Sequence, residues 1–164
     1  MKLKSLKDLY VDHLRDLYSA EKQITKALPK MAKAASSPGL QNAFREHLAQ
    51  TKEHVRRIEE IFDKLGMSPK GKKCKGMEGL LKEGEELMHQ ASEEAVLNAA
   101  LIAAAQRVEH YEIASYGAAR SYANLVGDEE AALLLQKTLD EEGETNKKLT
   151  RLAEGDINVQ AVKG

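Results

Sequence analysis

Residues 97–122 constrain the fold most, because two glutamates interrupt an apolar helical stripe. At about 100° per residue, one face carries Leu97, Leu101, Ala104, Val108, Tyr111, Ser115, Ala119 and Tyr122. Glu112 lies within this stripe, and Glu109 lies one turn earlier at its edge. Desolvating an unpaired carboxylate costs several kcal/mol. The pattern therefore predicts a buried helix whose glutamates are neutralised by protons, basic side chains or metal ions.

The composition favours a single all-α domain. The chain has 164 residues, enough for a core without disulfides, and only three prolines among 31% charged and 42% hydrophobic residues. The net charge of −1 gives no general indication of nucleic-acid or membrane binding, and no apolar run reaches the roughly 18 residues of a membrane span. Cys74 is the single cysteine. We therefore expect a cytoplasmic protein that binds neither nucleic acid nor a membrane.

Four long helices and one short helix are predicted from apolar periodicity and end signals. Ser5 and Ser37 are expected N-caps, and Gly66 and Gly155 are expected helix ends. The expected helices cover approximately residues 5–35, 38–65, 77–91, 92–127 and 128–154, where 77–91 is the short one. Residues 1–155 are expected to form the domain, and 156–164 a flexible tail.

The lengths of the connections predict the topology. Short turns join the long helices into two antiparallel hairpins, 5–65 and 92–154. The connection between the hairpins, which carries the short helix, is long enough to cross the length of a bundle. Two hairpins with one long crossover form the ferritin-like four-helix arrangement.

The two hairpins also repeat each other with an offset of 91 residues, the difference between Glu112 and Glu21. The same offset pairs apolar positions in both helices, among them Leu6 with Leu97, Leu17 with Val108, Phe44 with Leu135 and Ile58 with Leu149. It further pairs polar residues: Gln50 with Glu141, Thr51 with Glu142, and His54 with Thr145. A pseudo-twofold axis would therefore place Glu21 opposite Glu112, within one polar level of all four helices.

Glutamates from two helices, with Glu and His from the other two, are the ligand set of dinuclear iron or manganese sites in such bundles. The candidate metal ligands are Glu21, His47, Gln50, His54, Glu109, Glu112, Glu141 and Glu142. Alternatives remain open: the Glu109 and Glu112 pair can share a proton or hydrogen-bond to neighbours, and His47 can be a core histidine. Periodicity favours Glu142 over Glu141, whereas the repeat with Gln50 favours Glu141.

Five segments resemble the YciE/YciF family of bacterial ferritin-like stress proteins: LYSAEKQITKALPKMAKAA, EHLAQTKEHVRRIEEIF, KCKGMEGLLKEG, AALIAAAQRVEHYEIASYG and TLDEEGETNKKLTRLA. The resemblance extends from Leu3 to about Leu152. It implies a bundle related to rubrerythrin and manganese catalase, a homodimer, and a dinuclear metal site. Family members commonly carry glutamate where this chain has Gln50, and the segment 128–154 has no histidine.

The leading functional hypothesis is a stress-response protein with a carboxylate-bridged iron or manganese pair that acts on peroxide or oxygen or binds iron. Glu21 and Glu112 are the expected bridging ligands, and His54 is the expected terminal ligand. The alternative is a non-catalytic dimeric helical or scaffold protein whose metal site is degenerate or empty. The same ligands serve iron and manganese, so the ligand types do not select the metal.

Overall fold

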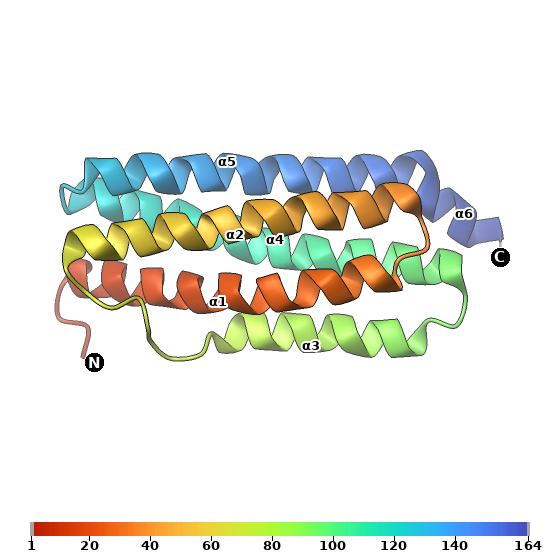
Figure 1. Ribbon diagram of the computed structural model, residues 1–164, viewed down its shortest axis with the longest axis horizontal. Helices are drawn as coiled ribbons and strands as arrows, with labels where there is room; N and C mark the ends of the chain where they lie inside the picture. Colours follow the sequence, from red (N-terminus) through yellow and green to blue (C-terminus); the bar gives the residue numbers. More distant parts are fainter. Residues whose placement is uncertain (1, 164) are drawn as a thin grey trace.

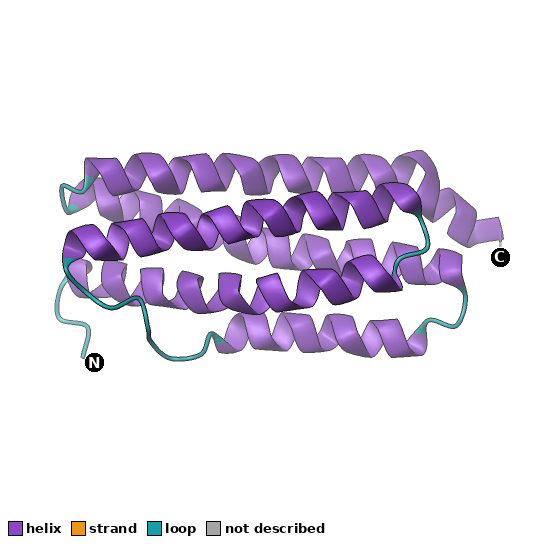
Figure 2. Ribbon diagram, viewed as in Figure 1, coloured by secondary structure: helices purple, strands orange, loops and turns teal. Residues whose placement is uncertain are grey.

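The computed structural model describes residues 2–163, and the regular elements in this range are all helical (Figures 1 and 2). They are α1 (Leu6–Ala34), α2 (Pro38–Leu65), α3 (Lys75–Gln90), α4 (Glu94–Leu125), α5 (Glu129–Leu152), the π-helical turn η1 (Ala153–Ile157) and α6 (Asn158–Lys163). None of the helices described is both long enough and apolar enough to cross a membrane. The all-α class is therefore confirmed.

The ends of α1 and α2 follow the expected local chemistry. The Ser5 Oγ accepts a hydrogen bond from the Asp8 N–H at 3.1 Å, and the Ser37 Oγ accepts one from the Leu40 N–H at 3.4 Å. Each caps a backbone donor that the first helical turn leaves unpaired. Gly66 ends α2 with φ of 63°, a left-handed conformation that glycine adopts without strain.

The four long helices lie side by side along the long axis of the molecule (Figure 1). α1 pairs with α2 and α4 pairs with α5, while α1 also packs on α4 and α2 on α5. The segment after α2 returns along the bundle through α3, which lies against α4 and α1 outside the four-helix core (Figure 1). This arrangement confirms the ferritin-like bundle with one long crossover.

The prediction that the last long helix ends at Gly155 is wrong. The chain stays helical through η1, where the Asn158 N–H donates to the Ala153 carbonyl five residues earlier, and continues as α6. Ile157 is buried in an apolar cluster with Leu40 and Leu149. Packing of this side chain offsets the roughly 1 kcal/mol that a helical glycine costs relative to alanine.

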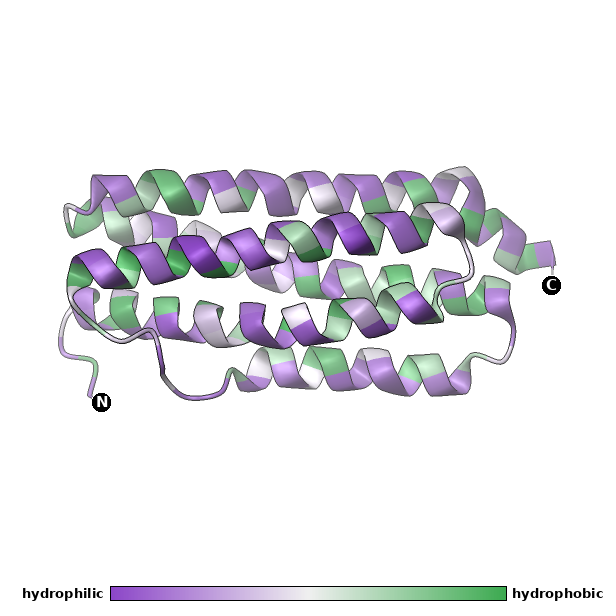
Figure 3. Ribbon diagram, in the orientation of Figure 1, coloured by the Kyte–Doolittle hydropathy of each residue, from purple (hydrophilic) through white to green (hydrophobic). Residues whose placement is uncertain are grey.

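The core consists of two apolar clusters separated by a polar layer. One cluster contains Ile24, Leu28, Phe44, Leu101 and Leu149; the other contains Leu14, Leu17, Ile58, Ala119 and Leu135. On each long helix, buried polar residues lie between the segments that build these two clusters: Glu21, His47, Thr51, His54, Glu109, Glu112, Ser115, Thr138 and Glu142. Figure 3 shows that the visible outer faces of α2 and α5 are largely hydrophilic. The polar layer differs from these outer faces because its residues are buried between the two apolar clusters.

Candidate metal centre

Six ionisable side chains from all four long helices form the polar layer, and each is at most 4% exposed. They fall into two groups in which one potential ligand atom per residue lies within 4.8 Å of the others. The first group contains His47, Glu109, Glu112 and Glu142; the second contains Glu21, His54 and Glu142. Because Glu142 belongs to both, the two groups are adjacent and share one carboxylate.

His54 of α2 contacts carboxylates through both ring nitrogens. Its Nδ1 lies 3.1 Å from Glu21 Oε1 and 2.9 Å from Glu142 Oε1. Its Nε2 lies 2.9 Å from Oε2 of Glu141, which is 25% exposed. Nδ1 therefore faces the buried cluster, and Nε2 faces the outside of it.

A buried arginine fixes the outer carboxylate. Arg57 donates from Nη1 to Glu141 Oε2 at 2.8 Å and from Nη2 to Glu141 Oε1 at 2.9 Å. Its Nη1 also donates to Thr138 Oγ1 at 3.0 Å. A bidentate arginine–carboxylate pair is geometrically specific, so it sets the position of the carboxylate that holds His54.

His47 lies in the other group of the cluster, and its ring nitrogen that points away from the glutamates has uncharged partners. Its Nε2 lies 2.9 Å from Glu109 Oε1 and 3.7 Å from Glu142 Oε2, without the alignment of a hydrogen bond. Its Nδ1 lies 3.3 Å from both Gln50 Oε1 and Thr145 Oγ1. The two histidines are therefore supported differently, His54 by an ion pair and His47 by an amide and a hydroxyl.

The cluster contains more acceptor atoms than the described residues satisfy. Both oxygens of Glu112 and of Glu142, together with Glu21 Oε2 and Glu109 Oε2, are buried without a hydrogen bond. Glu21 Oε1 is satisfied, because the Tyr116 hydroxyl donates to it at 2.5 Å. Unpaired buried carboxylate oxygens are costly unless a proton or a cation neutralises them. Four glutamates and two imidazoles fit two divalent cations, because their charges then balance.

The pKa values of the buried glutamates shift in opposite directions. Burial is the largest cause that raises the pKa of Glu109 and of Glu112 well above the usual carboxyl value, and the charge of Glu142 is the second. Burial alone would also raise the pKa of Glu142, but the neighbouring Glu109 carboxyl, the close contact with His54 and the charges of both histidines lower it to about 2. Without metal, the charged form is therefore favoured most at Glu142, and Glu109 and Glu112 bind protons more readily than an exposed carboxylate does.

Both histidines are protonated in this environment. Burial lowers the pKa of His47, but Glu109 and Glu142 outweigh it and raise the value to about 9. Burial likewise lowers the pKa of His54, and its contacts with Glu142 and Glu21 raise the value to about 11. The metal-free cluster thus holds protons that a metal ion would have to displace.

The metal-free protein is expected to lose stability as the pH rises from 6 to 9. Folding raises both histidine pKa values above the ordinary 6.5, so the proton-linked stabilisation is complete below pH 6.5. It is lost as the pH passes through about 9 for His47 and about 11 for His54. Urea unfolding of chelator-treated protein should show a decrease of several kcal/mol. His47→Gln should reduce this slope, whereas His110→Gln, at an exposed position of α4, should retain it; equal slopes would contradict the assignment.

Six of the eight predicted ligands, all of them glutamates or histidines, lie in these two groups. Glu141 belongs to neither group and contacts His54 from the outer side. Gln50, whose residue type these groups do not include, contacts the outer nitrogen of His47. The internal repeat already contained a pattern that favours Glu142 and His54 as ligands. Thr51 and His54 are three residues apart, as are their offset partners Glu142 and Thr145, so each half retains one residue of the Glu-x-x-His pair of dinuclear bundles.

From the sequence, Tyr116 was expected to be a packing residue or a hydrogen-bond donor beside the ligands, whereas Arg57 was not identified as a partner of the cluster. Arg57 is only 4% exposed and donates hydrogen bonds to Thr138 and Glu141. Tyr116 is fully buried, and its hydroxyl contacts Glu21. Both contacts join residues more than 80 positions apart, so helical periodicity within one segment does not reveal them.

Comparisons with known proteins give one consistent family. The family model described as a domain of unknown function, DUF892, matches residues 5–162. Protein YciF of Escherichia coli K12 is 44% identical over 162 residues, which are 98% of each chain. The crystal structure of this stress protein superposes with a TM-score of 0.91 and covers 95% of this chain and 99% of that one.

More distant structures show the same fold. YcfI of Rhodopseudomonas palustris is 40% identical with a TM-score of 0.89 and covers 91% of this chain and 95% of its own. A protein of Xanthomonas campestris at 20% identity has a TM-score of 0.77 and covers 97% of this chain and 98% of its own, which shows a shared fold alone.

Proposed function

This chain belongs to the DUF892 family together with the stress protein YciF, and on that premise we propose that it is a stress-response protein with a dinuclear iron or manganese centre that acts on peroxide or oxygen. One observation carries the proposal: four buried glutamates with unpaired oxygens converge with two histidines at the centre of the bundle. Such a group is costly without cations and matches the ligands of dinuclear carboxylate sites.

The two groups of side chains correspond to two ion positions. Glu21 and His54 would hold one ion, and His47 and Glu109 the other. Glu142 belongs to both groups and would therefore help to hold both ions, while the bridging role expected for Glu21 and Glu112 stays a prediction. Glu112 lies beside Glu21 and Glu142 and completes the carboxylate set. Bound iron or manganese would supply redox chemistry toward oxygen or peroxide.

The chain's own residues orient these ligands. The Tyr116 hydroxyl engages one oxygen of Glu21 and leaves the other unpaired. Glu141, held by Arg57, accepts from the Nε2 side of His54 and directs Nδ1 toward the cluster. Carboxylate partners of this kind fix the tautomer of a metal-binding histidine and increase its basicity.

Glu141→Gln is expected to weaken metal binding by about tenfold, because the amide is a poorer acceptor for the His54 ring N–H and a poorer partner for Arg57. Competition with a chromophoric chelator measures the affinity. Arg57→Lys should show a smaller loss, since lysine retains the charge without the bidentate geometry. Glu144→Gln on the exposed face of α5 is the control. Unchanged affinity in Glu141→Gln would exclude this positioning role.

Metal loading distinguishes the proposal from a non-catalytic scaffold with an empty site. Protein incubated anaerobically with Fe²⁺ or Mn²⁺ and then desalted should retain about two ions per chain. Peroxide consumption by loaded and metal-free protein then tests the reaction. Retention of far less than one ion per chain under both conditions would favour the scaffold.

A homodimer remains a prediction from the family resemblance. Leu125 near the end of α4 and Leu133 in α5 are 72% and 73% exposed, and a second copy that covers these leucines would remove apolar surface from water. Sedimentation of the wild type and of a Leu125→Lys/Leu133→Lys variant tests this. A wild-type monomer at micromolar concentration would contradict it.

A further inference from the structure

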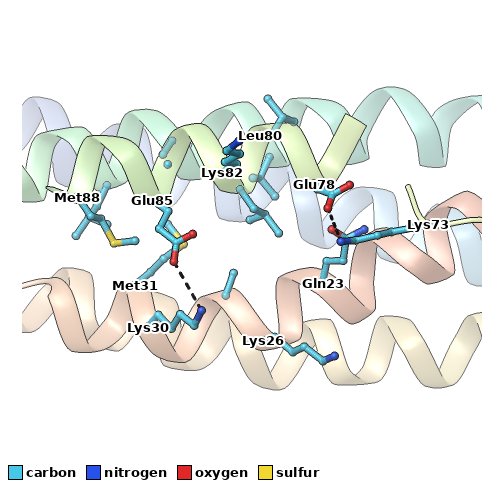
Figure 4. Close-up of a pocket in the computed structure, with 16 residues that line it drawn as sticks. Gln23, Lys26, Lys30, Met31, Lys73, Glu78, Leu80, Lys82, Glu85 and Met88 are labelled. Atoms are coloured by element: carbon cyan, nitrogen blue, oxygen red, sulfur yellow. Dashed lines mark hydrogen bonds and ion pairs between the residues drawn. The ribbon is translucent and has the colours of Figure 1, made fainter. Parts of the chain in front are cut away.

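A groove between α1 and α3 has a chemistry that the buried cluster does not use (Figure 4). Its volume is about 500 Å³, which lies within the range of small-molecule sites in proteins. The inner walls are apolar and come from α1, α3 and α4: Met31, Leu80, Leu81, Met88, Leu101 and Val108. A molecule held here would bury apolar surface between the bundle and the crossover helix.

The rim of the groove is basic, although the whole chain has a net charge of −1. Four lysines line it, Lys26, Lys30, Lys73 and Lys82, with only two glutamates. Lys30 reaches across to Glu85, and Lys73 contacts Glu78 (Figure 4). Lys26 and Lys82 form no ion pair with residues 2–163. Two of the four rim lysines are therefore not held in a close ion pair within residues 2–163, although Lys82 lies near enough to Glu78 to help lower the pKa of that carboxyl.

The existing ion pair across the groove is easily exchanged. Lys30 Nζ lies 3.8 Å from Glu85 Oε1, and both side chains are more than half exposed. Exposed pairs of this kind contribute little stability. An incoming anion would thus replace Glu85 on Lys30 at small cost.

The position of α3 explains why the groove lies on its α1 side. Gly84 lets α3 approach α4 closely, since a Cβ at this position would lie 3.3 Å from the Ala104 Cβ. α3 makes fewer contacts with α1 than with α4. The crossover helix is therefore anchored on one helix and leaves a space above the other.

We infer that this groove binds a small amphiphilic anion, an aliphatic chain that ends in a carboxylate. The chain would lie along the apolar walls, and the carboxylate would lie among the rim lysines. A small inorganic anion would leave the apolar walls without a partner, and a neutral or cationic amphiphile would leave the lysines without one. The match of both parts therefore favours a free amphiphilic anion, and a carboxylate with an aliphatic chain is the form of it that we test.

The inner end of the groove approaches the buried cluster. Leu81 and Val108 line both the groove and a narrow cavity of about 20 Å³ that touches His47 and Glu109. This cavity has room for about one water molecule. The aliphatic chain of the bound ligand would end one layer of side chains away from the buried cluster. The inference concerns binding to the metal-free protein, so its test does not depend on whether the protein has a metal centre.

Methionine methyl groups report on this binding directly. Met31 and Met88 line the groove, whereas Met67 lies in the turn after α2. In metal-free protein labelled with ¹³C at the methionine methyls, decanoate added as monomers should shift the signals of Met31 and Met88 and leave Met67 unchanged. Decanol and decyltrimethylammonium provide neutral and cationic probes with the same chain, and both should bind more weakly.

Two variants separate the polar and apolar parts of the site. Lys26→Glu/Lys82→Glu breaks no ion pair among residues 2–163 and should weaken decanoate binding by about tenfold. Lys22→Glu/Lys52→Glu, at exposed positions outside the groove, changes the net charge equally and should leave the affinity within about twofold. Ala27→Leu fills the groove and should weaken all three probes.

The inference would be overturned by equal or tighter binding of the cationic probe, by equal shifts at Met67, or by unchanged affinity in Lys26→Glu/Lys82→Glu. Absence of any shift at Met31 and Met88 would do so too. Binding to anionic vesicles without binding of monomeric decanoate would assign the lysines to a membrane surface and also contradict the proposal.

Discussion

Glu142→Gln is expected to reduce the metal content of the loaded protein from about two ions per chain to well below one. Glu142 is the residue common to both potential ligand groups, so its loss removes a ligand from both positions at once. The amide is nearly isosteric but neutral, and it binds hard cations less well than a carboxylate. Elemental analysis of variant and wild type, loaded in parallel, measures the effect.

Two matched variants make this result specific. Glu144→Gln lies on the same helix at an exposed position and pairs with Lys147, so it should retain the wild-type metal content. Glu21→Gln affects the second group only and should lose about one ion. If Glu142→Gln retained as much metal as Glu144→Gln, the shared position of Glu142 in a metal centre would be excluded.

Glu112→Gln is expected to have opposite effects on the two forms of the protein. In the metal-free form, both oxygens of Glu112 are buried without a hydrogen bond, and burial with Glu142 raises its pKa. The amide removes an ionisable group and can donate to Glu21 or Glu142, so the unfolding free energy should rise by about 2 kcal/mol. In the loaded form the same change removes a ligand and should lower stability.

Thermal unfolding distinguishes the two effects. For a chain of this size, about 2 kcal/mol corresponds to a Tm increase of roughly 4 to 8 °C without metal. With excess metal, wild type should gain stability that the variant lacks, because only binding to the folded state stabilises it. Glu144→Gln should follow the wild type in both conditions. A loss of stability in metal-free Glu112→Gln would show that its carboxylate makes a favourable interaction without metal.

The fold was accessible from sequence because its signals are local and repeat. Ser5, Ser37 and Gly66 mark helix ends through contacts within a few residues, and the offset of 91 residues doubles the information on each hairpin. The end of the last long helix was mispredicted at Gly155 because the burial of Ile157 in the apolar cluster that contains Leu40 and Leu149 is a tertiary effect that outweighs local propensity.

The sequence predicted which helical turns contribute to the candidate site. Glutamates within apolar stripes placed Glu21, Glu112 and Glu142 in the interior, and burial of each is complete. Whether Gln50 and Glu141 point into the cluster or lie beside it depends on a rotation of about one residue around the helix axis, which periodicity does not resolve. The contact between Arg57 and Glu141 joins α2 to α5. Periodicity gives the direction of a side chain but not its partner on another helix.

Anomalous diffraction from crystals of the metal-loaded protein tests the central claim most directly. Data collected on both sides of the absorption edge of the loaded metal, iron or manganese, should show two peaks per chain inside the four-helix bundle. One peak is expected between Glu21 and His54 and the other between His47 and Glu109, with Glu142 adjacent to both. Crystals that contain the metal only at surface positions, with the polar layer free of anomalous signal, would contradict a dinuclear centre in this protein.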